Sequence, residues 1–172
     1  LITGHTGFKG GWLSLWLKHL GAKVSGYSLS PITNKNFFDI TKLKNIFDNE
    51  FKKNIQNMND LSKAVKKIKP QIIFHLAAQP QVLESYNNPY NTVLSNTMGT
   101  TNILEIGRKF KFVKSIVIIT TDKVYKNNER KIKFNEDDPL GGDDLYSSSK
   151  ASADIITLSY LTSFYEKKKN VV

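Results

Sequence analysis

Short apolar segments alternate with longer amphipathic segments along almost all of the 172 residues, and this alternation constrains the fold more than any other feature. Strands alternating with helices form a parallel sheet, and right-handed crossovers place helices on both of its faces. We therefore expect an α/β fold with a doubly wound, Rossmann-like sheet. Strands are expected at residues 1–3, 23–27, 53–56, 71–75 and 114–120, helices at 10–20, 60–67, 88–108 (or from 91) and 144–166, a short helix or turn at 41–50, and a polar loop at 123–135.

Both ends of the chain interrupt this pattern. Residue 1 is Leu, and only three residues precede Gly4, which is too few for a normal buried strand. At the other end, residues 170–172 begin an apolar run that stops. We expect one domain over residues 1–172 that is truncated at both ends.

The charge is strongly positive, with 25 Lys and Arg against 15 Asp and Glu, a formal net charge of +10. Such an excess invites a nucleic-acid partner. However, Arg108 and Arg130 are the only arginines, and the lysines are dispersed. Because arginine is favoured for reading grooves and for bidentate phosphate contacts, we interpret the lysines as a solvated surface and expect no nucleic-acid partner.

Cysteine is absent, which excludes disulfides, iron–sulfur clusters and thiolate zinc sites. The histidines His5, His19 and His75 are scattered, so we expect no metal site. The longest apolar runs, such as residues 115–119, are too short to cross a bilayer, and no charged-then-apolar leader opens the chain. We therefore expect a cytoplasmic protein with no membrane partner.

A glycine-rich turn lies between the first expected strand and the first helix. Gly4, Gly7 and Gly10 have the spacing GxxGxxG, a variant of the usual GxGxxG dinucleotide fingerprint. Glycine lets the backbone turn sharply and approach a pyrophosphate at the helix N-terminus. The acidic residue expected near the end of the second strand for a ribose hydroxyl is missing, and Ser28 is available there instead. Charge therefore leaves the choice between NAD and NADP open.

Residues 146–150 have the sequence YSSSK near the start of the last helix. Tyr146 and Lys150 are four residues apart and share one helix face. An ammonium beside a phenol favours the phenolate, which takes a proton from an alcohol as hydride leaves. Alone this pattern is weak, because helices carry such pairs by chance.

Three other segments also carry residues that suit a cofactor or substrate site. Residues 120–123 (TTDK) follow the strongest strand, and ligands bind beyond the carboxyl ends of such strands. Asn96 lies inside a helix that it disfavours, which indicates a specific task, although a surface amide is the plainer interpretation. Small residues at 76–79 (LAAQ) would leave room for a flat cofactor, or simply pack tightly.

These motifs in this order resemble the extended short-chain dehydrogenase/reductase superfamily. Within it, the chain is similar to the CDP-glucose 4,6-dehydratases on residues 4–10 (GHTGFKG), 12–17 (WLSLWL), 75–80 (HLAAQP), 121–125 (TDKVY) and 136–142 (EDDPLGG). Sugar epimerases and TDP-glucose dehydratases usually lack the first of these forms, and the TDP-glucose enzymes carry Glu in place of Lys123. The match covers almost all of the chain but roughly the N-terminal half of that family's length.

The resemblance implies an NAD(P)-binding domain whose C-terminal substrate-binding region is absent, a nucleotide-sugar substrate and a homodimer. NAD is the implied cofactor, with NADP not excluded. The implied catalytic residues are Thr121, Asp122, Lys123, Tyr146 and Lys150. The implied cofactor-binding residues are Gly4, Thr6, Gly7, Phe8, Lys9, Ser28, Asn57, Met58, Leu76, Ala77, Ala78, Gln79, Asn96, Thr120, Tyr146 and Lys150.

The implied reaction converts CDP-glucose to CDP-4-keto-6-deoxyglucose. Tyr146, helped by Thr121, deprotonates the 4-hydroxyl while hydride passes to bound NAD. Lys123 removes the C5 proton, Asp122 protonates the departing 6-hydroxyl, and the hydride returns to C6. Two alternatives remain: an epimerase or ketoreductase of the same superfamily, and a non-catalytic nucleotide-binding module.

The sequence also departs from the family. Asn57 stands where an Asp near the adenine is usual, and Leu83 and Glu84 replace two arginines, which bears on substrate contacts. Asp143 and Leu145 replace the usual Tyr and Pro before the catalytic Tyr.

Overall fold

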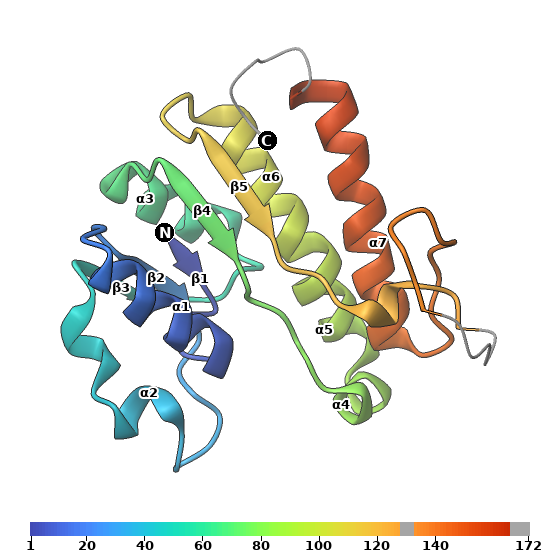
Figure 1. Ribbon diagram of the computed structural model, residues 1–172, viewed down its shortest axis with the longest axis horizontal. Helices are drawn as coiled ribbons and strands as arrows, with labels where there is room; N and C mark the ends of the chain where they lie inside the picture. Colours follow the sequence, from blue (N-terminus) through green and yellow to red (C-terminus); the bar gives the residue numbers. More distant parts are fainter. Residues whose placement is uncertain (128–132, 166–172) are drawn as a thin grey trace.

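The computed structural model describes residues 1–127 and 133–165, and its centre is a five-stranded parallel sheet (Figure 1). The strand order is β3-β2-β1-β4-β5, so the chain starts in the middle, builds to one edge and then crosses to the other. This is the predicted doubly wound order, and the α/β prediction is confirmed. The strands are β1 (Ile2–Thr3), β2 (Ser25–Ser28), β3 (Asn49–Lys52), β4 (Ile72–His75) and β5 (Ser115–Ile118).

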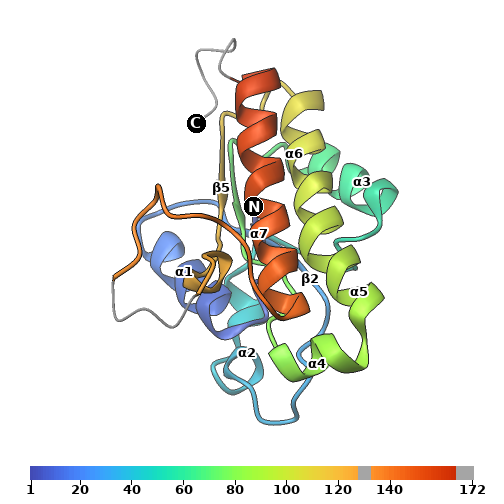
Figure 2. The ribbon, with the colours of Figure 1, turned by 90° about the vertical axis from the view of Figure 1, so that its right-hand side faces the viewer.

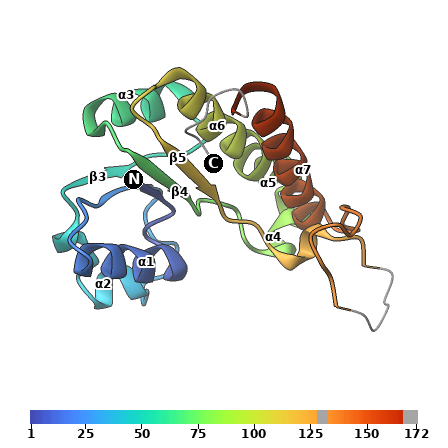
Figure 3. The same cartoon turned by 45° about the horizontal axis from the view of Figure 1, so that its top comes forward.

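Helices cover both faces of the sheet, as Figure 3 shows. One face carries α1 (Phe8–His19), α2 (Phe37–Ile40) and the 3-10 turn η1 (Leu43–Ile46). The other face carries α3 (Met58–Ile68), α5 (Pro89–Val93), α6 (Gly99–Lys109) and α7 (Leu145–Tyr160). The remaining elements are α4 (Val82–Asn87), η2 (Leu94–Met98), the 3-10 turn η3 (Asp122–Val124) and η4 (Leu161–Tyr165).

The expected long helix is α5, η2 and α6 in succession, and η2 is a π-helical turn. α7 packs against all three, and Figure 2 shows these helices side by side. A π turn inserts one extra residue into a helix and often marks a functional site. Here Asn96 lies in the turn, and it is 1% exposed.

Two boundary predictions were wrong. The third strand is residues 49–52 rather than 53–56, because Tyr27 and Ser28 pair with Phe51 and Lys52 and the chain then turns away. The N-cap of α3 is Asn57 rather than Asp60, since the Asn57 side chain accepts a hydrogen bond from the Asp60 backbone N–H.

The main core lies between the sheet and the α3–α6 layer. Tyr27 and Ile73 from the strands pack with Leu61, Ile103 and Ile106 from the helices, and none of these side chains is exposed. Fully burying an aliphatic side chain stabilises a fold by roughly 1.5–3 kcal/mol. This core holds the strands in place so that their carboxyl ends meet along one edge.

Candidate active site

The glycine turn is shaped by close backbone approach. Gly4 has a φ of 75°, and a Cβ there would lie 2.7 Å from the Ala77 backbone nitrogen. A Cβ on Gly10 would lie 2.2 Å from the Gly4 carbonyl oxygen. Gly7 is the N-cap of α1 and supplies no side chain, and the first turn of α1 contains no acidic residue. Because the first N–H groups of an α-helix have no partner within the helix, the start of α1 is suited to bind an anion such as a pyrophosphate.

The residues around this turn divide into a buried and an exposed group. Thr6 is 9% exposed, and its hydroxyl donates to the Leu29 carbonyl at 3.0 Å. The Ser28 hydroxyl lies 2.9 Å from the Thr6 hydroxyl oxygen. Because the Thr6 proton is already donated to Leu29, Ser28 is the donor in this second bond. Phe8 and Lys9, in the first turn of α1, are exposed. Ser28 thus stands at the end of β2, where the expected carboxylate is missing.

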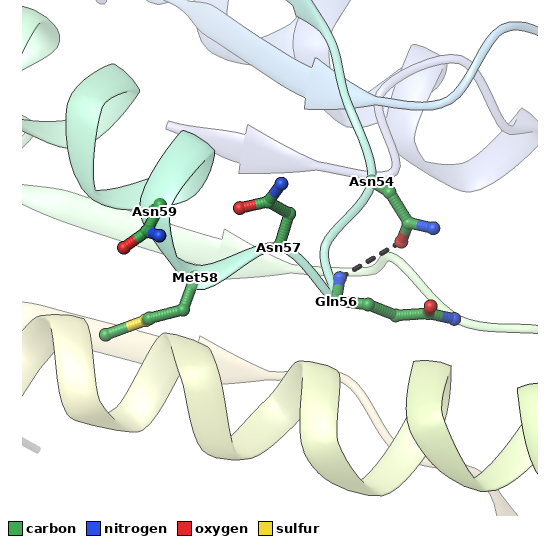
Figure 4. Close-up of a pocket in the computed structure, with 5 residues that line it drawn as sticks. All are labelled: Asn54, Gln56, Asn57, Met58 and Asn59. Atoms are coloured by element: carbon green, nitrogen blue, oxygen red, sulfur yellow. Dashed lines mark hydrogen bonds between the residues drawn. The ribbon is translucent and has the colours of Figure 1, made fainter.

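A hollow of about 530 Å³ lies in the connection from β3 to α3 (Figure 4). It is an open, shallow depression in the surface rather than an enclosed cavity. Gln56 ties it to the α5 side through hydrogen bonds to Asn91 (2.6 Å) and Ser95 (2.8 Å). The lining residues are Asn54, Gln56, Asn57, Met58 and Asn59, which include the predicted cofactor-binding residues Asn57 and Met58.

Asn96 connects the loop after β4 to α7. Its side chain accepts from the Gln79 backbone N–H at 2.8 Å and donates to the Gln79 carbonyl at 3.1 Å, which fixes the loop after β4. It also donates to the Ser149 hydroxyl in α7 at 2.9 Å. The interpretation of Asn96 as a surface amide is therefore wrong. Leu76, Ala77 and Ala78 lie between β4 and this clamped residue.

Lys150 is anchored at the end of β5. It is 7% exposed, and its Nζ donates to the Ile119 carbonyl at 2.8 Å. Burial lowers the pKa of Lys150, although the charge of Asp154, one turn later, opposes the shift. Tyr146 is half-buried one turn earlier on the same face of α7. The predicted pair is thus held beside the segment that follows β5.

That segment contains Thr120 and the turn η3. Thr121 caps η3, and its hydroxyl donates to Asp122 at 3.2 Å. Asp122 and Lys123 are exposed, whereas Val124 is buried and η3 packs against α7. The structure therefore places the Thr-Asp-Lys motif and the Tyr146–Lys150 helix against each other at the carboxyl end of the sheet.

The start of α7 is also fixed. Asp144 is its N-cap and accepts from the Ser147 backbone N–H at 2.9 Å and from the Ser147 hydroxyl at 2.6 Å. Burial raises the pKa of Asp144, but these bonds and the charge of Lys123 outweigh it and lower the pKa overall. Lys123 therefore acts electrostatically on the carboxylate that caps the N-terminus of α7.

The predicted cofactor residues follow the carboxyl ends of the strands or lie in η2 and α7, and we call this set the cofactor path. It includes Asn57 between β3 and α3, the glycine turn after β1, Asn96 in η2 and Lys150 in α7. The colliding Cβ positions, the acid-free start of α1 and the hollow fit a dinucleotide. Within residues 1–127 and 133–165, no cluster of His, Asp or Glu could hold a metal ion, and no helix is long and apolar enough to span a membrane.

A model of the GDP-mannose 4,6 dehydratase family matches residues 1–170. This chain belongs to that family. It is 41% identical to a CDP-glucose 4,6-dehydratase from Salmonella typhimurium over 95% of its length and 45% of the relative's length. The chain spans about half the length of the curated relatives it matches.

Solved structures agree with this assignment. A dTDP-glucose 4,6-dehydratase from Bacillus anthracis, in complex with NAD, is 27% identical and superposes with a TM-score of 0.75 over 99% of this chain and 51% of that one. A UDP-glucose 4-epimerase from Thermus thermophilus, 22% identical, shares the fold with a TM-score of 0.80 over 95% of this chain and 50% of that one. The resemblance expected from the motifs is confirmed at the level of family and fold.

Proposed function

We propose that this protein is an NAD-dependent CDP-glucose 4,6-dehydratase that forms CDP-4-keto-6-deoxyglucose. The observation that carries the proposal is the hydrogen bond from the buried Lys150 ammonium to the Ile119 carbonyl, which joins α7, the helix of Tyr146, to the segment that leads into η3. The 41% identity to a CDP-glucose 4,6-dehydratase supports this choice of substrate.

The path described above would hold NAD, with the adenine in the hollow at Asn57 and the pyrophosphate at the glycine turn. When bound, NAD would supply the hydride acceptor and donor that the reaction at C4 and C6 of the hexose needs. The domain over residues 1–172 would thus supply the cofactor site and the reacting groups. The nucleotide of the substrate would be held mainly by a separate C-terminal region.

The side chains divide the proton transfers between them. Tyr146 takes the proton of the sugar 4-hydroxyl, with the ammonium of Lys150 and the hydroxyl of Thr121 orienting the reacting groups. The resulting ketone acidifies the C5 proton, which Lys123 removes. Asp122 donates a proton to the departing 6-hydroxyl, so that one water leaves and no net oxidation occurs.

The test is mass spectrometry of CDP-glucose incubated with the complete protein and NAD. We expect the product to be lighter by one water. Lys123→Ala should stop the water loss, whereas Lys126→Ala, an exposed lysine in the same segment, should leave it unchanged. Water loss at an unchanged rate in Lys123→Ala would show that the assigned base is wrong.

A second activity on the same fold is an epimerase. The chain is 31% identical, over 95% of its length, to a CDP-paratose 2-epimerase from Salmonella typhi. This similarity favours an epimerase over other classes. A product that keeps its 6-oxygen would indicate epimerisation, and steady accumulation of reduced cofactor would indicate a ketoreductase. Salt-sensitive binding to DNA without turnover would instead favour a non-catalytic module.

We also propose a homodimer in the complete protein. In a chain with 25 Lys and Arg, residues 89–104 hold no charged residue, and α7 holds two, the buried Lys150 and Asp154. Charged residues are depleted at the centres of interfaces. The exposed apolar side chains of these helices are Tyr90, Val93, Met98, Ile155 and Leu158.

Sedimentation velocity tests the dimer. Leu158→Glu should give a monomer, whereas Ile40→Glu, on exposed α2 across the sheet, should leave the assembly intact. A wild-type monomer at micromolar concentration would contradict the proposal.

We place the protein in the cytoplasm, because its proposed substrate and cofactor are cytoplasmic metabolites, and cell fractionation would check this location.

A further inference from the structure

The roles proposed above leave out a buried histidine at the centre of the site. His75 is the last residue of β4 and is 2% exposed. Both ring nitrogens have partners: Nδ1 lies 2.7 Å from the Thr3 hydroxyl, and Nε2 lies 3.2 Å from the Thr100 hydroxyl. The ring therefore connects β1 to α6, the helix that packs on the sheet.

The neighbouring bonds determine which nitrogen carries the proton. The single Thr100 hydroxyl proton goes to the backbone carbonyl of Asn96 at 2.7 Å, so the Thr100 oxygen accepts from His75 Nε2–H. Nδ1 is then an acceptor, and the Thr3 hydroxyl donates to it. The Thr3 oxygen in turn accepts from the Ala77 backbone N–H at 3.2 Å.

All these bonds point in one direction, from Ala77 through Thr3, His75 and Thr100 to the Asn96 carbonyl. Such a chain needs a neutral ring, and hydrogen bonds in series strengthen one another. Desolvation by burial lowers the pKa of His75 to about 3, and the charge of Lys150 acts in the same direction. Protonation of the ring would place a second donor against Thr3 and break the sequence.

The two ends of the chain reach the two halves of the site. Thr3 immediately precedes Gly4, the first glycine of the pyrophosphate turn. Asn96 lies in the π turn and is bonded to Ser149, the neighbour of Lys150 in α7. Thr97 adds a bond from its hydroxyl to the Ser149 carbonyl at 3.1 Å. The histidine thus joins the cofactor turn to the helix that carries the proton-transfer pair.

We propose that His75, held as the neutral Nε2–H tautomer, is a positioning residue that sets the spacing between the glycine turn and the Tyr146–Lys150 helix. The proposal rests on the proposed function, because its kinetic readout is dehydration. The His75 ring acts through Thr100 and Asn96 and makes no contact with the substrate.

Thr100 variants of the complete protein provide the kinetic test. Thr100→Val keeps the shape but removes the hydroxyl that connects His75 to Asn96, and we expect turnover to fall by about 10- to 100-fold, as small misplacements of reacting groups do. Thr100→Ser restores the hydroxyl and should restore turnover. The control is Thr101→Val, which removes the matching bond to the Thr97 carbonyl without touching His75. Equal turnover in Thr100→Val and Thr101→Val would overturn the proposal.

Nitrogen NMR of the histidine rings provides a readout that does not depend on activity. We expect the wild-type His75 ring to carry its proton on Nε2 at neutral pH, and Thr100→Val to disturb that tautomer. A ring protonated on Nδ1, or on both nitrogens, would overturn the assignment. If the wild-type protein leaves CDP-glucose unchanged, the proposed function fails separately, and NAD affinity in the same variants then decides whether His75 positions the site.

Discussion

His75 should make the stability of the fold strongly dependent on pH. In an unfolded chain a histidine has a pKa of about 6.5, whereas burial lowers the pKa of His75 to about 3. Below the first value the unfolded state binds a proton that the folded state refuses. Stability is therefore complete above about pH 6.5 and is lost progressively as the pH falls toward about 3.

The size of this effect follows from the two pKa values. One pH unit between them is worth about 1.36 kcal/mol, so the loss between about pH 7.5 and about pH 4.5 is about 2.7 kcal/mol. Because the side chain is 2% exposed, solvent screening does little to reduce the figure. A domain of ordinary stability, about 5–15 kcal/mol, would lose a substantial fraction of it.

The assay is urea unfolding at several pH values across this range, for the wild type and for His75→Gln. The variant lacks the imidazole, so its free energy of unfolding should fall less steeply, whatever its stability at neutral pH. Desolvation also lowers the pKa of buried His5, which contributes equally to both proteins. Parallel curves for the two proteins between about pH 6.5 and about pH 4.5 would refute the assignment of a buried neutral ring at His75.

Three further perturbations test other parts of the structure. A Cβ on Gly26 would lie 2.5 Å from the buried His5 ring, so Gly26→Ala should lower the free energy of unfolding by about 1–3 kcal/mol in a urea titration; an unchanged midpoint would mean that the ring moves without strain. Asp144→Ala removes the two bonds to Ser147 and should cost about 1 kcal/mol, with Asp143→Ala as a control of similar charge. Lys150→Met should reduce the turnover number about 100-fold or more while NAD still binds, and wild-type turnover in this variant would exclude the ammonium from catalysis.

The parts of the fold that depend on local pattern were predictable. The β-branched run at residues 114–120 became β5, and the glycine turn became a close passage of backbone past backbone at Gly4 and Gly10. Residues 36–56 were harder, because the local signals there are weak. Asn36 caps a four-residue helix, and the strand at Asn49–Lys52 is defined by its pairing with β2, a contact that lies more than twenty residues away in sequence.

The site shows the same division. The i, i+4 spacing of Tyr146 and Lys150 and the position of Thr121 after a strand follow from single elements, and the structure brings these elements together. The network through His75 was not predictable, because its bonds join residues up to 74 positions apart and the tautomer depends on all of them. A Thr-rich helix around an Asn was the one sequence signal of this network, since such residues disfavour helices unless their side chains have partners.

The cofactor path carries little charge of its own, which bears on the choice between NAD and NADP. The residue at the end of β2 is Ser28, whose hydroxyl donates to Thr6. This position therefore has neither a carboxylate that would repel a 2′-phosphate nor an arginine that would bind one. In the hollow, the Asn57 side-chain oxygen is used to cap α3, which leaves its amide N–H groups for a ligand. Apart from Lys9 and Lys150, the predicted cofactor residues are uncharged, and the other positive charges of the chain lie elsewhere. We therefore expect the loop that follows β2 to decide the preference for one dinucleotide.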